Sequence, residues 1–189
     1  MLGALAAPLL RAYCAPRAGR FAAALDDVGA AQRATLARIV RASAATGYGR
    51  SLGLAADDDL ATFRAKVPLA DYAALAPWID AQRAGGAEAM APGSTRCYET
   101  TSGSSGAAKH IPYNDALLGA FRGMFAIWAH DLLTHALRPR SGRAFMSVSP
   151  PVDGREGFAD DRAYLAAPLR ALVGRFIVAP PRLAEPVSY

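Results

Sequence analysis

A ten-residue segment rich in glycine and hydroxyl side chains, residues 100–109, constrains this chain more than any other feature. It reads Thr-Thr-Ser-Gly-Ser-Ser-Gly-Ala-Ala-Lys and follows a stretch rich in β-forming residues. Glycine permits positive φ and close approach of the backbone to a ligand. Successive N–H groups in such a turn bind phosphate oxygens. The segment predicts either a loop that holds the phosphates of a nucleotide or an ordinary flexible Gly/Ser turn.

The lysine that ends this segment is one of only two in the chain. Of the 21 basic residues, all except Lys66 and Lys109 are arginine. A compact, flexible ammonium differs from a rigid guanidinium fork in how it meets a phosphate. A lysine at position 109 therefore favours the anion-binding interpretation.

The spacing of the loop separates it from other glycine-rich loops. A Walker A loop has its lysine directly after the second glycine, but Ala107 and Ala108 intervene here. A dinucleotide fingerprint would need glycine where Thr101 stands. A nucleophile elbow would need glycine at position 107. The pattern that fits residues 101–109 is [ST]-[ST]-G-[ST]-[ST]-G-x-x-K, which resembles the phosphate loop of adenylate-forming enzymes.

Two other functions stay open for the same loop. Its serine run is similar to that of amidases, which would make Ser104 or Ser105 a nucleophile and require an upstream lysine as base. The only upstream lysine is Lys66, which is poorly spaced for that role. The other alternative is a non-catalytic binding or interaction protein that retains a phosphate-binding loop.

Composition excludes several further classes. The 189 residues are 52% hydrophobic with a formal net charge of +5, which favours a globular chain over a disordered one. The arginines are scattered and no basic-aromatic platform occurs, so nucleic-acid binding is not expected. No metal site is expected either, because the histidines and cysteines lack ligand spacing. Cys14 and Cys97 are expected to be unpaired thiols in a reducing cytoplasm, although a bridge between them stays open.

The first 92 residues predict a helical N-terminal region. Its first segment predicts an amphipathic helix, with a signal peptide as the alternative. No apolar run reaches the length of a membrane span. A second helix is expected to be capped by Asp26 or Asp27 and to end at Gly47, with an inner face of Leu36, Ile39, Val40 and Ala44. A short helix is expected after residues 57–59 and should end at Pro68. A further helix is expected over 69–84, interrupted near Pro77 and ended by Gly85 and Gly86.

Residues 93–189 predict a partial α/β ATP-binding region, and both regions are expected to belong to one incomplete N-terminal domain. Strands are expected at 95–101, 110–113, 143–148 and 176–178, with some parallel pairing. Asn114 is expected to cap the longest helix, and a second helix is expected over 161–173 after a loop at 153–161. The apolar stripe of the longest helix is read as core, and it consists of Leu117, Phe121, Met124, Phe125, Trp128 and Leu132.

Several short motifs occur in one order along the chain. They are Ala-Gln-Arg at 31–33, Ala-Thr-Gly-Tyr-Gly-Arg at 45–50, Phe-Arg-Ala-Lys-Val-Pro-Leu at 63–69, Asp-Tyr at 71–72 and the loop followed by His-Ile-Pro at 110–112. Together they resemble a bacterial-type member of the auxin-responsive Gretchen-Hagen family of acyl-acid amido synthetases. The likeness spans roughly residues 20–150. One departure is Ala108, where many members have proline.

The resemblance implies a ligase that uses ATP and Mg²⁺. A carboxylic acid would attack the α-phosphate of ATP to give an acyl-adenylate, and an amine or amino acid would then displace AMP to form an amide. Lys109 would be the catalytic residue, and the phosphates would be held by Thr101, Ser102, Gly103, Ser104, Ser105, Gly106 and Lys109. Members of the family are much longer, so the chain is expected to be a truncated N-terminal fragment, inactive alone and partnered by a C-terminal portion.

Overall fold

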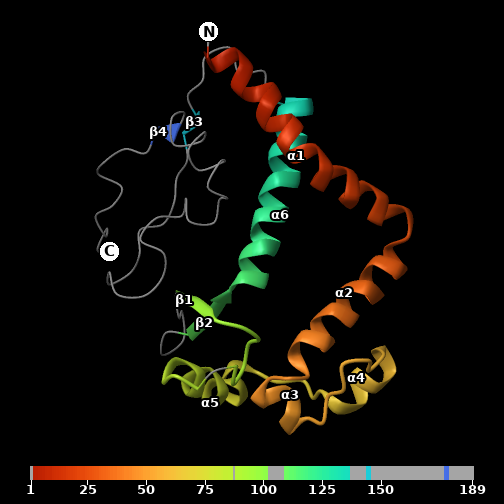
Figure 1. Ribbon diagram of the computed structural model, residues 1–189, viewed down its shortest axis with the longest axis vertical. Helices are drawn as coiled ribbons and strands as arrows, with labels where there is room; N and C mark the ends of the chain where they lie inside the picture. Colours follow the sequence, from red (N-terminus) through yellow and green to blue (C-terminus); the bar gives the residue numbers. More distant parts are fainter. Residues whose placement is uncertain (1, 87, 102–108, 137–143, 146–176, 179–189) are drawn as a thin grey trace. The chain divides into compact units, whose positions relative to one another are not determined.

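The fold is described by a computed structural model covering residues 2–86, 88–101, 109–136, 144–145 and 177–178 (Figure 1). The chain divides into two compact units, one formed by Ala24–Ala116 and the other by Met1–Ala23 with Leu117–Tyr189. The described elements are α1 (Leu2–Asp26), α2 (Val28–Ser43), α3 (Gly47–Ser51), α4 (Leu60–Lys66), α5 (Tyr72–Arg83), β1 (Thr95–Thr101), β2 (Lys109–Asn114), α6 (Asp115–Asp131), a π-helical turn (Leu132–Ala136), β3 (Ala144–Phe145) and β4 (Ile177–Val178). Helices followed by strands confirm the α/β class with a helical N-terminal region.

Aspartates begin three of the helices in the unit Ala24–Ala116. The carboxylates of Asp27, Asp59 and Asp71 each accept a hydrogen bond from the backbone N–H three residues later, at 2.8–2.9 Å. Such caps satisfy donors that have no partner within the helix. The cap predicted at Asp26 or Asp27 is therefore confirmed at Asp27, and Asp59 and Asp71 cap α4 and α5 in the same way. Within this unit α5 lies beside β2, and α4 lies beside α2 (Figure 1).

The extents of two helices differ from the prediction. Gly47 does not end α2, which stops at Ser43; it begins α3 after the cap Thr46. The helix α5 continues through Pro77 without interruption. The proline is exposed, and Ile79 and Gln82 anchor the helix beyond it by burial, so one lost backbone hydrogen bond does not break it.

Burial also differs from the prediction on two helices. On α2 Val40 is buried, but Ile39 is 47% exposed. On α6 the buried residues are Leu118 and Ala126, whereas Met124 and Trp128 of the predicted stripe are 51% and 57% exposed. Periodicity identifies an apolar stripe, but it does not fix which part of that stripe is covered by neighbouring chain.

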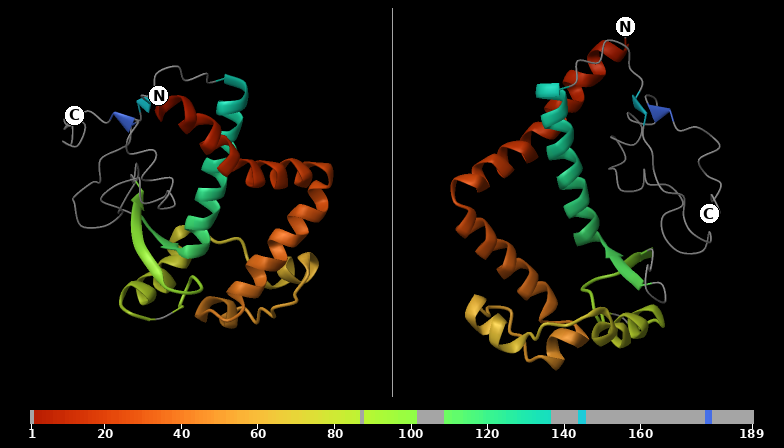
Figure 2. Two further views of the ribbon diagram at one scale, coloured as in Figure 1. Left: turned by 45° about the horizontal axis from the view of Figure 1, so that its top comes forward. Right: turned by 180° about the vertical axis from the view of Figure 1, so that it is seen from behind.

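The unit Met1–Ala23 with Leu117–Tyr189 contains most of the two longest helices. The longest is α1 with 25 residues, not α6 with 17. Averaged over its 25 residues, α1 does not separate apolar and polar residues onto opposite faces, so amphipathic character does not extend along the whole helix. Within this unit α1 crosses the C-terminal half of α6 (Figure 2). No helix in the described part of the chain has both the length and the apolar character needed to cross a membrane.

The described strands form two two-stranded sheets. β1 and β2 are antiparallel, with Thr95 opposite Asn114 and Thr101 opposite Lys109. β3 and β4 are parallel, which confirms the expected parallel pairing in the later half. The loop predicted at 153–161 and the helix predicted at 161–173 lie outside the described residues.

Both cysteines are free thiols, Cys14 buried and Cys97 half-buried. Burial, and to a lesser extent the charge of Glu99, raises the pKa of Cys97 from 9.0 to about 11. The folded chain thus favours the neutral thiol, and this contribution to stability is complete below pH 9 and lost as the pH rises towards 11.

We expect Cys97 to react slowly with alkylating reagents. A shift of the pKa from 9.0 to about 11 lowers the thiolate fraction at pH 8 about a hundredfold. The measurement is the rate of iodoacetamide modification in a Cys14→Ala chain, native and in urea, across pH 7–11.5. The native rate should rise with a midpoint near 11, and a native midpoint at 9.0 would contradict this prediction.

Candidate functional site

The hairpin of β1 and β2 holds the two ends of the predicted phosphate loop. Thr101 ends β1, Lys109 begins β2, and the two residues are direct partners in the antiparallel register. The predicted site residues Ser102, Gly103, Ser104, Ser105 and Gly106 lie outside the described residues. The structure therefore brings the first and last members of the predicted site together, across a segment of seven intervening residues, 102–108.

Lys109 is the predicted catalytic residue, and its side chain is exposed. Its Nζ lies 5.8 Å from the centroid of the Tyr72 ring, within the range of a cation–π contact. The next residue, His110, donates its backbone N–H to the Tyr72 hydroxyl oxygen at 2.8 Å. The ammonium is thus accessible to a ligand while the start of β2 is attached to α5.

Gln82 of α5 is hydrogen-bonded to the segment that precedes β1 and to the first residue of β1. Its Oε1 accepts backbone N–H groups of Met90 at 2.8 Å and Ala91 at 2.7 Å. Its Nε2 donates to the hydroxyl of Thr95 at 2.7 Å and to the carbonyl of Ala91 at 3.3 Å. Because Gln82 is buried, these bonds place the first residue of β1 relative to α5.

We expect Gln82→Leu to lower the free energy of unfolding by about 2 kcal/mol, because two backbone N–H groups lose their acceptor. Chemical denaturation monitored by circular dichroism measures this change. Gln32→Leu is the matched control, since Gln32 is an exposed helical glutamine and its replacement should change stability by less than about 0.5 kcal/mol. Equal effects of the two substitutions would contradict the role given to Gln82.

The other end of the hairpin is bonded to Asp115 and to Pro92. The Arg96 guanidinium on β1 binds both carboxylate oxygens of Asp115 at 2.9 and 2.8 Å. The Asn114 side-chain amide donates to the Pro92 carbonyl at 2.9 Å. The hairpin is therefore bonded to α5, to Pro92 and to Asp115.

The Thr-Gly-Tyr-Gly motif at 46–49 has a structural role. The Thr46 hydroxyl donates to the Ser43 carbonyl at 2.7 Å and accepts the Gly49 N–H at 3.0 Å. The ring of Tyr48 packs edge-on against Trp78 of α5, with centroids 5.7 Å apart. The motif thus caps α3 and joins it to the helix that supports Lys109.

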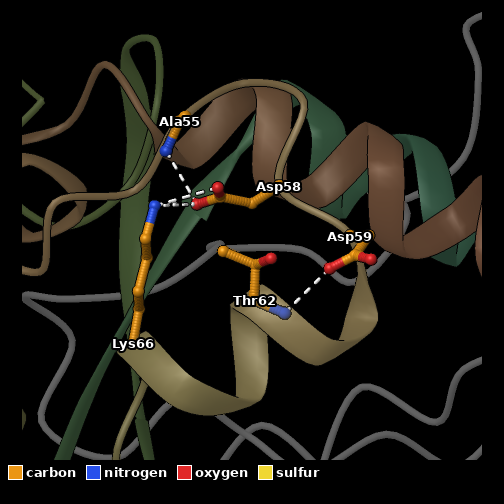
Figure 3. A network of polar contacts seen from close by, with 5 residues as sticks. All are labelled: Ala55, Asp58, Asp59, Thr62 and Lys66. Carbon is orange, nitrogen blue, oxygen red and sulfur yellow. Dashed lines mark hydrogen bonds and ion pairs between the residues drawn. The ribbon is translucent and has the colours of Figure 1, made fainter.

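The Phe-Arg-Ala-Lys-Val-Pro-Leu motif at 63–69 is held by an ion pair (Figure 3). The Lys66 ammonium donates to both carboxylate oxygens of Asp58 at 2.9 and 2.8 Å. Hydrogen bonding from Lys66, together with the bond from the Ala55 N–H, lowers the pKa of Asp58. The ion pair between Lys66 and Asp58 therefore persists as the pH falls. Lys66 is committed to a structural ion pair, which argues against its use as the base of an amidase.

A groove of about 490 Å³ joins these two motifs. It is open and mainly apolar, and its walls include Tyr48, Val67, Leu75 and Met90. Residues from two separate motifs thus line one groove. Among the residues that the structure describes, no group of three or more His, Cys, Asp or Glu side chains is placed to hold a metal ion.

Residues 17–158 match the GH3 family N-terminal domain, which is more than half of the chain. The chain belongs to the GH3 family. The resemblance inferred from the ordered motifs is thereby confirmed. No solved structure matches this GH3 chain.

Two curated relatives come from Oryza sativa subsp. japonica. Jasmonoyl–L-amino acid synthetase GH3.3 is 36% identical over 103 residues, which is 53% of this chain and 22% of the relative. Probable indole-3-acetic acid-amido synthetase GH3.12 is 34% identical over 131 residues, which is 68% of this chain and 19% of the relative. The chain spans about a fifth of the length of these relatives.

Sequence reasoning missed the contacts that Tyr72 and Gln82 make with the hairpin. Tyr72 belongs to the Asp-Tyr motif at 71–72, but the motif by itself does not indicate a contact with the hairpin. Gln82 gave no signal, because a single polar residue in a helix is ordinarily exposed. Only the hydrogen bonds in the folded chain show that both side chains contact the hairpin.

Proposed function

We propose that this GH3 chain binds ATP through the loop between β1 and β2 and contributes to acyl-acid amide synthesis. Membership of a family with acid-amido synthetases supports the reaction class. The observation that carries the site is the pairing of Thr101 with Lys109, which sets the exposed ammonium at one end of a loop of hydroxyl and glycine residues.

The proposed first step needs no nucleophile from the protein. An oxygen of the substrate carboxylate attacks the α-phosphorus of ATP, the bond to the bridging oxygen breaks, and pyrophosphate leaves. The ammonium of Lys109 and the donors of residues 101–106 offset the charge on the leaving group. Preorganised donors of this kind are the main protein contribution to phosphoryl and nucleotidyl transfer.

The proposed second step is attack of an amine on the activated carbonyl carbon. The amide forms, AMP leaves with the electrons of the broken acyl–oxygen bond, and the amine loses one proton. Mg²⁺ bound to the phosphates supplies further positive charge, and we assign no residue of the chain to it. The acid and amine named for the rice relatives suggest a small carboxylic acid and an amino acid as substrates.

We also propose a cytoplasmic location. Free thiols at Cys14 and Cys97 fit a reducing compartment. The cytoplasm also contains ATP, which the proposed activation of the acid consumes.

The experiment that tests the proposed function is acid-dependent exchange of labelled pyrophosphate into ATP by the gene product at its full length. A panel of aromatic and aliphatic carboxylic acids is offered one at a time with Mg²⁺. Exchange that requires both ATP and an acid supports the proposal. No exchange with any acid, together with no measurable ATP binding, would overturn it.

A further inference from the structure

The first residue of α5 contacts two consecutive residues at the start of β2. We propose that Tyr72 is a positioning residue, which holds Lys109 where it meets the phosphates of a nucleotide. This inference rests on the proposed function, because it assumes that Lys109 binds those phosphates. It adds Tyr72 to the residues of the proposed phosphate site, although Tyr72 lies 38 positions before His110, to which it is hydrogen-bonded.

Tyr72 acts on the backbone and on the side chain of the same short segment. Its hydroxyl oxygen accepts the His110 N–H at 2.8 Å, which fixes the peptide directly after Lys109. Its ring lies 5.8 Å from the Lys109 Nζ, which favours one region of space for the ammonium. One side chain therefore restrains both the anchor and the free end of Lys109.

Tyr72 is itself held in place. The carboxylate of Asp71 caps α5 by accepting the Ala74 N–H at 2.9 Å, and Tyr72 is the first residue of that helix. Gln82, near the other end of α5, is bonded to residues 90, 91 and 95. The tyrosine thus projects from a helix that is bonded to neighbouring chain near both of its ends.

The contact leaves the ammonium usable by a ligand. Lys109 is exposed, and Tyr72 is half-buried. A lysine side chain has many rotamers, and restricting them before binding lowers the entropy lost when a phosphate is bound. A cation–π contact at an exposed site supplies such a restriction without neutralising the charge.

The geometry is tested first without any nucleotide. Lysine labelled with ¹³C at Cε gives two resonances, because the chain contains only Lys66 and Lys109, and Lys66→Arg assigns them. The ring of Tyr72 should shift the Lys109 Hε signal upfield, and Tyr72→Leu should remove that shift. Tyr13→Leu is the matched control, since Tyr13 lies 5.8 Å from the Arg17 guanidinium and not near a lysine. A Lys109 signal unchanged by Tyr72→Leu would overturn the proposal.

The function is tested by calorimetric binding of ATP and AMP to the full chain. Tyr72→Phe keeps the ring but loses the acceptor for His110, whereas Tyr72→Leu loses both. We expect ATP affinity to fall about threefold and about tenfold respectively, while AMP affinity stays within about twofold. In a Lys109→Met background Tyr72→Leu should cause no further loss, because the two residues act through one interaction.

The outcomes separate this inference from the proposed function. Equal losses of ATP and AMP affinity, or an undiminished effect of Tyr72→Leu in the Lys109→Met background, would show a merely structural tyrosine and overturn the inference alone. Wild-type chain that binds ATP no better than AMP, and no better than Lys109→Met does, would overturn the proposed function and this inference with it.

Discussion

Replacing Lys109 by methionine is expected to reduce acid-dependent ATP–pyrophosphate exchange about a hundredfold, with little change in the free energy of unfolding. The side chain is exposed, so its loss removes few packing contacts. Removal of one preorganised charged donor from a site of this kind costs about 10²–10³ in rate. Steady-state exchange assays, with circular dichroism of the same samples, measure both quantities.

The chain offers a matched control for this prediction, because it has only one other lysine. Lys66→Arg should keep exchange within about twofold of wild type, since arginine also forms bidentate bonds with a carboxylate such as Asp58. Lys109→Arg should lose most activity, because a guanidinium fork does not reproduce a compact ammonium beside Tyr72. Equal activity of the two arginine variants would contradict the role of Lys109.

Gly49→Ala is expected to lower the free energy of unfolding by more than about 3 kcal/mol, the upper end of what overpacking costs. A Cβ at position 49 would lie 2.0 Å from the Ser43 carbonyl oxygen. That oxygen cannot move freely, because it accepts hydrogen bonds from the Thr46 hydroxyl at 2.7 Å and from the Thr46 N–H at 2.9 Å. Denaturant titration measures the loss, which should accompany disruption of α3.

The matched control for Gly49 is Gly29, which lies in the same unit near the start of α2. Its Cβ would meet only the ends of flexible side chains, the closest being an Arg33 guanidinium nitrogen at 3.2 Å. Gly29→Ala should therefore change stability by no more than about 1 kcal/mol, in either direction. A Gly49→Ala chain as stable as Gly29→Ala would show that the Thr-Gly-Tyr-Gly turn does not need glycine.

Much of the framework around the loop follows from local sequence. The strand predicted over 95–101 has those limits as β1, because a run of β-forming residues ends where glycine and serine begin. The caps at Asp27, Asp59 and Asp71 follow from the chemistry of free helix N–H groups. Parallel pairing of the two later strands follows from the alternation of predicted helices and strands.

The features that sequence did not reveal depend on contacts between distant residues. Continuation of α5 through Pro77 depends on anchoring at Ile79 and Gln82. The role of Gly47 as the start of α3, and not as the end of α2, depends on hydrogen bonds that residues 47 and 48 donate to the carbonyls of Glu88 and Ala89. The position of Tyr72 beside Lys109 depends on packing of α5 against β2. None of these contacts has a signature in local composition.

The central claim is that the segment from Thr101 to Lys109 binds the triphosphate of ATP. Its most direct test compares ATP and AMP affinity in wild-type chain and in a chain with Lys109→Met, Ser104→Ala and Ser105→Ala combined. We expect wild type to prefer ATP over AMP, and we expect the triple variant to lose this preference while AMP binding remains. A triple variant that still binds ATP as tightly as wild type would contradict the account.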